Sequence, residues 1–210
     1  MCEEDLDVSV MPTDSFDLPR FDRPVDVDGH VALLPADATC KGMFFRDLLD
    51  LASKTGSSEE IATAAGIPHR RYVPFLDYPM ADNLRLTVEI ARRVHLGVPL
   101  GEGLRRLGRS GFSTFLSSHI GRVLVLAASH DVGAVLMLAP RAFRVIMNFG
   151  NVTTERPSER HVVARCRALP AFVETYQVGA LEGIFDHFGI DGRVRVAMNG
   201  LADGTIEARW

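Results

Sequence analysis

The chain has few cysteines, no long hydrophobic run, and no basic N-terminal region followed by an apolar stretch. Its three cysteines, Cys2, Cys40 and Cys166, lie far apart and form no Cys-x-x-Cys pair. This pattern argues against a disulfide framework and against a structural zinc site. No run approaches the roughly 20 apolar residues of a membrane-spanning helix, and no signal peptide is visible. The sequence therefore predicts a cytoplasmic protein with no membrane partner.

The common catalytic and metal-binding motifs are also absent. The seven histidines show no His-x-x-x-His or His-Glu-x-x-His spacing, so we expect no metal site. No Gly-x-Ser-x-Gly elbow is present to carry a serine nucleophile. The glycines of residues 101–108 follow no expected strand and do not match the dinucleotide-binding fingerprint. From these absences we predict a protein that is not an enzyme.

The composition is that of a globular domain, but its charge is uneven. The chain has 210 residues, 47% of them hydrophobic and 24% charged, which is enough for a substantial core. Residues 1–30 contain nine acids and two bases, a net charge of -7, whereas the remaining 18 acids and 21 bases give +3. We interpret residues 1–30 as an acidic, flexible leader. The alternative is an arm that docks on an Arg-rich surface of its own domain or on a partner.

The spacing of apolar residues changes at Pro140. Residues 31–140 carry apolar residues at three- and four-residue spacing, which predicts a helical half. Beyond Pro140 apolar and polar residues alternate, which is typical of antiparallel strands with one face on a core. The expected strands are 143–149, 162–168, 193–198 and 205–209. We expect residues 141–210 to form a sheet-plus-helix half that packs with the helical half as one domain.

A long helix over residues 172–188 separates the second and third expected strands. It has a broad apolar face and ends at Gly189, a residue suited to a left-handed cap. Gly179 and Gly183 lie four residues apart in it, which indicates that another element approaches its backbone closely. The predicted fold class is α+β. A helical half is followed by a four-stranded antiparallel sheet covered by one long helix, in the order strand–strand–helix–strand–strand.

Residues 57–76 offer a different interpretation. The run from Glu60 to Pro68, followed by Tyr72 and Phe75, resembles the helix-turn-helix of tetracycline-repressor-type regulators. That resemblance implies a DNA-binding regulator, although Pro74 and Pro79 interrupt the expected recognition helix. We expect nucleic acid not to be the partner, because only His69, Arg70 and Arg71 supply positive charge there.

A second resemblance covers the chain from about Gly42 to Trp210. The segments 101–109, 118–122 and 181–183 resemble a family of uncharacterised proteins that occurs in many copies in myxobacteria. The layout is similar to haem-nitric oxide/oxygen sensor domains and to vinyl-reductase-type small-molecule-binding domains. His130, Pro140 with Phe143, and Val178 with Gly179 are the residues that match.

The resemblance implies a non-catalytic sensory or regulatory module that binds a small apolar molecule, a protein partner or both; a homodimer is left open. A ligand pocket is expected between the helical half and the sheet, lined by His130, Phe143, Met147, Tyr176 and Gly179. The Tyr-x-Ser-x-Arg motif of the haem sensors is missing, so we expect no cofactor. The alternative is a haem-type gas sensor in which His130 ligates the iron.

Overall fold

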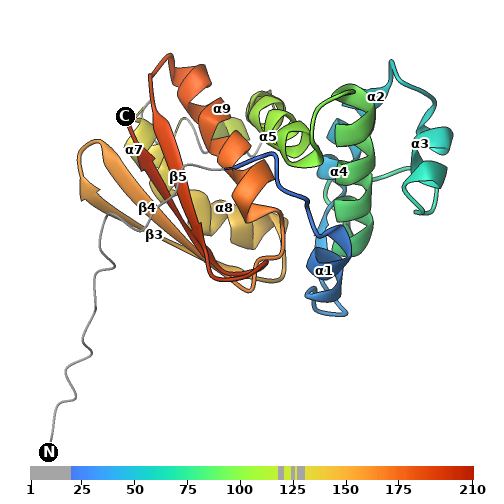
Figure 1. The fold of residues 1–210 in the computed structure, drawn as a ribbon, viewed down its shortest axis with the longest axis horizontal. Helices are drawn as coiled ribbons and strands as arrows, with labels where there is room; N and C mark the ends of the chain where they lie inside the picture. Colours follow the sequence, from blue (N-terminus) through green and yellow to red (C-terminus); the bar gives the residue numbers. More distant parts are fainter. Residues whose placement is uncertain (1–19, 118–120, 124–125, 127–130) are drawn as a thin grey trace, which may run out of the picture.

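The computed structural model describes residues 20–117, 121–123, 126 and 131–210 (Figure 1). Helices occupy most of the first two thirds of the described chain, as the sequence predicts, and a small two-stranded sheet that the sequence did not predict lies among them. The elements are α1 (Val27–Ala32), β1 (Thr39–Lys41), α2 (Gly42–Ala52), α3 (Ser58–Ala64), β2 (Asp77–Pro79), α4 (Met80–Val94), α5 (Leu100–Ser117), α7 (Val132–Met137) and α8 (Ala139–Ile146). Among the described helices, none is long and apolar enough to cross a membrane.

A four-stranded antiparallel sheet follows, so the predicted α+β architecture is confirmed. Its strands are β3 (Asn151–Ser158), β4 (His161–Arg167), β5 (Arg193–Met198) and β6 (Gly204–Arg209), in the spatial order β3-β4-β6-β5. Ala208 of β6 is directly opposite Val162 of β4 on one side and Val194 of β5 on the other. These three apolar side chains therefore face the same side of the sheet. The other side carries the alternating polar residues.

The expected first strand is wrong. Residues 143–146 belong to α8, and the first strand of the sheet is β3, eight residues further along the chain. Pro140 lies in the first turn of α8, where its missing N–H costs nothing. Phe143 and Met147 share a side in a helix and in a strand alike, since four residues are close to one helical turn and are also an even number. Val145 between them is 52% exposed, which fits the helix, because in a strand it would lie on the same side as Phe143 and Met147.

The central helix forms where the sequence predicts it. It begins as the π-helical turn η2 (Val173–Gln177), in which the Gln177 amide donates to the Phe172 carbonyl at 3.2 Å, and continues as α9 (Val178–Phe188). Phe172 precedes it in a left-handed conformation with φ 53°, and Gly189 ends it with φ 62°. The close approach expected at Gly179 is real: a Cβ there would lie 1.9 Å from the Arg105 carbonyl oxygen of α5.

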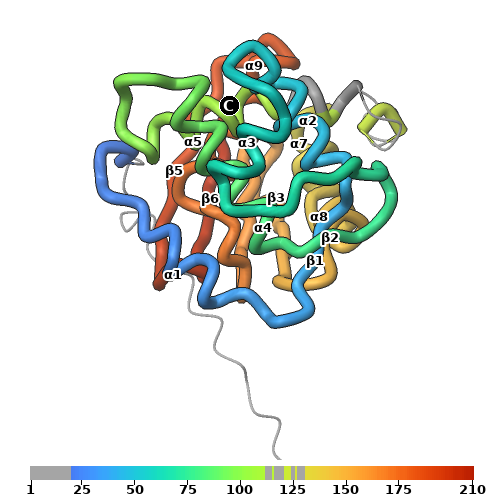
Figure 2. Tube along the Cα trace, turned by 90° about the vertical axis from the view of Figure 1, so that its right-hand side faces the viewer, coloured from blue at the N-terminus to red at the C-terminus, as the bar shows by residue number. Residues whose placement is uncertain are grey.

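The helices that cover the sheet lie one behind another on one side of it. Figure 1 shows α9 between the sheet and α5, with α4 and α2 beyond α5. Figure 2, viewed from the helical side, shows α1 to α5 in front of the sheet. Fully buried Phe45, Leu86, Leu104 and Val178 belong to one continuous hydrophobic core that runs through these layers. The two halves therefore share a core, and the space between them holds the site described below.

The first described residues are packed on the body. The Phe21 ring lies 4.9 Å from the Arg105 guanidinium carbon, and His30 in α1 is fully buried. His30 Nε2 lies 3.2 Å from Glu174 Oε1 in η2, and its ring tilts against Phe172. The proposed division of the chain at residues 30 and 140 stays a prediction. The segment from Phe21 to His30, however, contacts the core instead of standing apart from it.

The helix-turn-helix interpretation of residues 57–76 is not supported by the structure. The first helix forms as α3, capped by Ser57 and Glu60, but no residue from 65 to 79 is helical. Pro68, Pro74 and Pro79 remove backbone donors at intervals that a helix does not tolerate. Tyr72 instead stacks on Phe45 of α2, with ring centroids 4.3 Å apart. No recognition helix is therefore available in this segment.

Candidate ligand cavity

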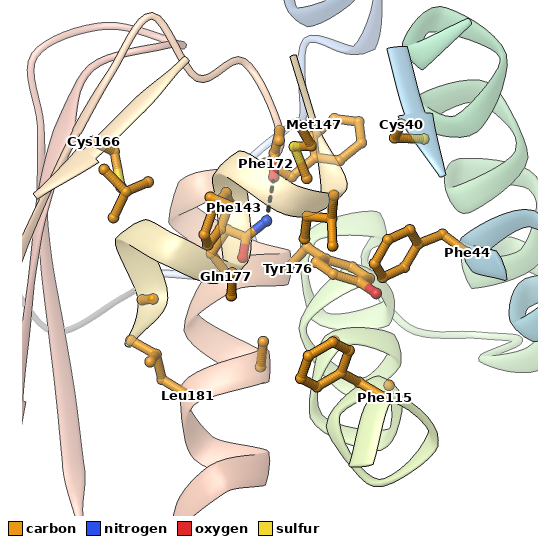
Figure 3. Close-up of a pocket in the computed structure, with 18 of the residues that line it drawn as sticks. Cys40, Phe44, Phe115, Phe143, Met147, Cys166, Phe172, Tyr176, Gln177 and Leu181 are labelled. Carbon is orange, nitrogen blue, oxygen red and sulfur yellow. Dashed lines mark hydrogen bonds between the residues drawn. The ribbon is translucent and has the colours of Figure 1, made fainter. Parts of the chain in front are cut away.

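A cavity of about 260 Å³ lies between the sheet and the helices that cover it (Figure 3). Its size is just below the range of about 300–1,000 Å³ typical of small-molecule sites. The inner faces of β3, β4 and β6 form one wall, and α2, α4, α5, α7, α8, η2 and α9 form the others. The ten residues labelled in Figure 3 are Cys40, Phe44, Phe115, Phe143, Met147, Cys166, Phe172, Tyr176, Gln177 and Leu181.

Most of the residues that line the cavity are apolar. Val162, Ala164 and Cys166 project from β4 because the strand alternates, and they place no charge on the cavity. Burial raises the pKa of the Cys166 thiol to about 11. For Cys40, burial together with nearby Asp77 raises the pKa to about 12. Both thiols therefore stay protonated at neutral pH and behave as small hydrophobic groups.

Polar groups gather at the helical end of the cavity. Burial, with smaller contributions from Asp47 and Cys40, raises the pKa of the Tyr176 phenol to about 12. Burial also raises the pKa of Asp47. Asn83 of α4 is only 8% exposed, and its Nδ2 has no hydrogen-bond partner among the described residues. Thr87 Oγ1 donates to the Asn83 carbonyl at 2.8 Å. This end can donate a hydrogen bond from Asn83 to an acceptor on a ligand.

The wall formed by η2 is held from both sides. Gln177 Nε2 donates to the Ala171 carbonyl at 3.2 Å, the bond drawn as a dashed line in Figure 3. On the far side of the turn, Glu174 faces buried His30. π-helical turns occur frequently at functional sites because they re-aim side chains within a helix. Here the turn directs Tyr176 and Gln177 into the cavity while Glu174 points to α1.

The structure brings together three of the five residues that the sequence places in the pocket. Phe143, Met147 and Tyr176 all line the cavity. Gly179 is not among the lining residues: it faces α5, because the crossing helix takes the space beside it. His130 lies outside the described residues.

Sequence analysis missed the polar lining, in particular Asn83, Asp47 and Gln177. One signal was present. Met80, Asn83, Leu84 and Thr87 recur at three- and four-residue spacing in α4 and are all buried, so two polar residues lie within an apolar stripe. Polar residues in such a stripe require partners, and a ligand can supply one.

Several solved structures that resemble the chain are H-NOX proteins. An Fe(II) unliganded H-NOX mutant from K. algicida has a TM-score of 0.62 at 15% identity, covering 80% of this chain and 95% of that one. The S. oneidensis H-NOX protein in the Fe(II)NO state has a TM-score of 0.61 at 14% identity, covering 80% and 98%. A third, described by haem redox potential and porphyrin distortion, has a TM-score of 0.61 at 14% identity, covering 81% and 99%. At these identities the likeness shows that the chain has an H-NOX-like fold.

The sequence itself identifies a protein family. The family described as "Protein of unknown function (DUF2378)" matches residues 34–210, and the chain belongs to this family. None of the curated proteins matches the chain significantly. The resemblances to an uncharacterised family and to the haem sensors' layout are thus both confirmed.

The comparison corrects our expectation about cofactors. We expected none, because the Tyr-x-Ser-x-Arg motif is missing. Two of the three structures above are described as Fe(II) forms, and the third by its haem redox potential. These neighbours point to haem and contradict the expectation of no cofactor. A single missing motif was too narrow a basis for it, since an apolar cavity can hold a large ligand by burial alone.

Proposed function

We propose that the chain is a non-catalytic sensory domain whose ligand occupies the cavity between the helical part and the sheet. The observation that carries the proposal is the cavity itself: an apolar space bounded by both halves of an H-NOX-like fold. A ligand there contacts the sheet, α8, η2 and α9 together. Its binding therefore favours one relative arrangement of these elements over others, which is the physical requirement for sensing.

Haem is the first ligand to test, because the structural neighbours are H-NOX proteins with iron or haem in their descriptions. The apolar walls formed by Phe143, Met147 and the inner face of β4 suit the faces of a porphyrin. When bound, haem supplies an iron centre that takes up diatomic gases. His130 is the residue that the family resemblance assigns as iron ligand, and it lies outside the described residues.

The propionates of haem fit the described lining less well. Asp47 is the only charged side chain among the described residues that line the cavity, and it is an acid. Burying two carboxylates without cations is costly. Haem would have to keep its propionates in solvent or pair them with groups outside the described lining.

An uncharged apolar molecule with one hydrogen-bond acceptor is the second candidate. The unpartnered Asn83 Nδ2 favours it, since a carbonyl or ether oxygen of the ligand would satisfy this buried donor. The Asn83 amide and the Tyr176 phenol lie at the same end of the cavity as Asp47, so a ligand there needs no negative charge of its own.

Titration of the purified protein with haem, and separately with an uncharged apolar fluorophore, tests the proposal. Ala142 of α8 lines the cavity, so Ala142→Phe should fill it and reduce uptake at least about tenfold. Ala64→Phe on the exposed surface of α3 is the matched control and should bind like the wild type. A Soret band that His130→Ala abolishes would favour haem, and selective binding of the fluorophore would favour the second candidate. If neither probe distinguishes Ala142→Phe from Ala64→Phe, the cavity is not the ligand site.

A further inference from the structure

The outer face of the four-stranded sheet, opposite the cavity, is rich in arginine. The described helices α7, α8 and α9 lie on the inner face with the cavity (Figure 1), and no described helix covers the outer one. Strand alternation brings five exposed arginines to this outer face: Arg165, Arg167, Arg193, Arg195 and Arg209. The acids among the described residues of the outer face are Glu155 and Glu207.

Only two of these arginines have acidic partners. Arg165 donates to Glu155 at 2.8 Å, and Arg209 Nε donates to Glu207 at 3.0 Å. Arg167, Arg193 and Arg195 have no ion-pair partner among the described residues. Arg195 is directly opposite Glu207 in the strand register, but Glu207 is 2% exposed and its carboxylate contacts Arg209 and His161 instead.

The register of the strands makes the excess charge more costly. Arg193 of β5 is directly opposite Arg209 of β6. Like charges in directly opposed positions destabilise a sheet. An anionic segment lying across β4, β6 and β5 would relieve the repulsion.

We propose that this arginine face binds residues 1–19 of the same chain. These residues contain six acids, Glu3, Glu4, Asp5, Asp7, Asp14 and Asp17, and no Lys or Arg. Removing those six from the 27 acids of the chain leaves 21, against 23 Lys and Arg, a net charge of +2 for residues 20–210. The acid-rich segment and the unpaired arginines thus carry complementary charge.

The attachment of this segment makes the contact effective. Phe21 holds the first described residues against α5, where its carbonyl oxygen would lie 2.7 Å from a Cβ at Gly101. From there 19 residues can span up to about 65 Å, more than a compact domain of this size measures across. Exposed ion pairs are individually weak. A tethered segment, however, acts at an effective concentration in the millimolar range, at which several weak pairs suffice.

A nucleic acid is the competing partner for an arginine face. The observations favour the acidic segment, because the body outside it has a net charge of only +2 and the segment is present on every molecule. A nucleic-acid site would need a stronger positive field.

A spin label on Cys2 of the full chain tests the proposal by paramagnetic broadening of backbone amide signals. Cys2 lies in the acidic segment, and the other two thiols are buried with raised pKa values. A label applied at neutral pH should therefore attach to Cys2, which mass spectrometry can verify. The expected result is broadening of the outer-face amides of β4, β5 and β6. About 0.5 M salt should abolish it by screening the charges.

Two variants with equal charge change complete the experiment. The variant Arg167→Gln/Arg193→Gln/Arg195→Gln should lose the broadening. The control Arg46→Gln/Arg71→Gln/Arg141→Gln removes three exposed arginines from the helical part and should retain it. Absence of broadening in the unmodified chain, or its persistence in the first variant, would overturn the proposal. In a mixture, spin-labelled chains without isotopes can be combined with isotope-labelled chains that carry no spin label. Broadening of the signals of the isotope-labelled chains would show that the face binds the segment of a second copy instead. Tight binding of a short oligonucleotide that only the first variant loses, with no broadening, would assign it to nucleic acid.

Discussion

The crossing of α5 and α9 leaves no room for an added methyl group at Gly179. A Cβ at Gly179 would lie 1.9 Å from the Arg105 carbonyl oxygen, and one at Gly108 would lie 2.1 Å from the Tyr176 carbonyl oxygen. Ordinary carbon–oxygen contacts are more than 1 Å longer, so neither helix can accept a side chain without moving. Arg105 also bridges the pair, with Nε 2.8 Å from Glu182 Oε2. Separation of the helices would stretch that ion pair as well.

We expect Gly179→Ala to lower the free energy of unfolding by about 2 kcal/mol. Overpacking at a rigid backbone contact costs about 1–3 kcal/mol or somewhat more. Replacing a helical Gly with Ala gives back up to about 1 kcal/mol through helix propensity. Because the obstacle is backbone and not the end of a flexible side chain, the cost should exceed the gain. For a domain of this length, the loss corresponds to a fall in Tm of about 4–8 °C.

Urea unfolding followed by circular dichroism measures the effect. Gly103→Ala, in the same α5 helix, is the matched control because its Cβ would lie 3.3 Å from the Ala91 carbonyl oxygen. That contact is tight but needs only a small adjustment, so the control should stay within about 1 kcal/mol of the wild type. A change below about 0.5 kcal/mol for Gly179→Ala would refute the close crossing. Tyr176 lies in the turn before α9, so the same substitution should also weaken ligand uptake.

Three further predictions concern buried groups. His30→Ala should lower the free energy of unfolding by about 3 kcal/mol in a urea titration, because it leaves a cavity and removes the buried partner of Glu174. The control His69→Ala, at an exposed position, should change it by less than about 0.5 kcal/mol. Equal effects of the two substitutions would show that α1 is not packed as described. The pKa of Tyr176 is raised from 10.0 to about 12, so its contribution to stability is fully present below pH 10 and is lost as the pH rises towards 12. Tyr176→Phe should flatten that part of the pH–stability curve, and an unchanged slope would contradict the burial of the phenol. Cys40 and Cys166 should react slowly with a thiol reagent at neutral pH in the folded protein and rapidly in urea, because burial raises both pKa values; rapid reaction of all three cysteines in the folded chain would show that the cavity wall opens freely.

Local pattern determined much of this protein. The alternation of Arg193, Val194, Arg195 and Val196 was enough to place β5 and to assign its faces, because a strand repeats every two residues. Gly189 marked the end of α9, and the two glycines within the helix marked a close approach. The capping pair of Ser57 and Glu60 placed α3. Each of these features depends on residues close together in the chain.

Where a helix and a strand place the same residues on one side, the sequence could not decide between the two secondary structures. Phe143 and Met147 lie on one side in a strand or a helix, so both line the cavity although residues 143–146 are helical and not a strand. The true first strand, β3, is an edge strand with one buried apolar residue, Val152, and its pattern is accordingly weak. Pairing with β4, which no local signal contains, decided that Asn151–Ser158 is a strand.

The cavity and the packing of the first described segment were decided by tertiary structure alone. Asn83, Tyr176 and Cys40 lie far apart in sequence and meet only because α4, η2 and β1 pack around one space. Gly179 was read as lining that space, but the crossing of α5 turned its bare backbone toward Arg105. His30 lies in a stretch whose composition suggests no core, yet it is fully buried against Glu174, 144 residues away. Contacts of such separation depend on how the layers stack, and sequence periodicity specifies which face of an element is apolar but not which element covers it.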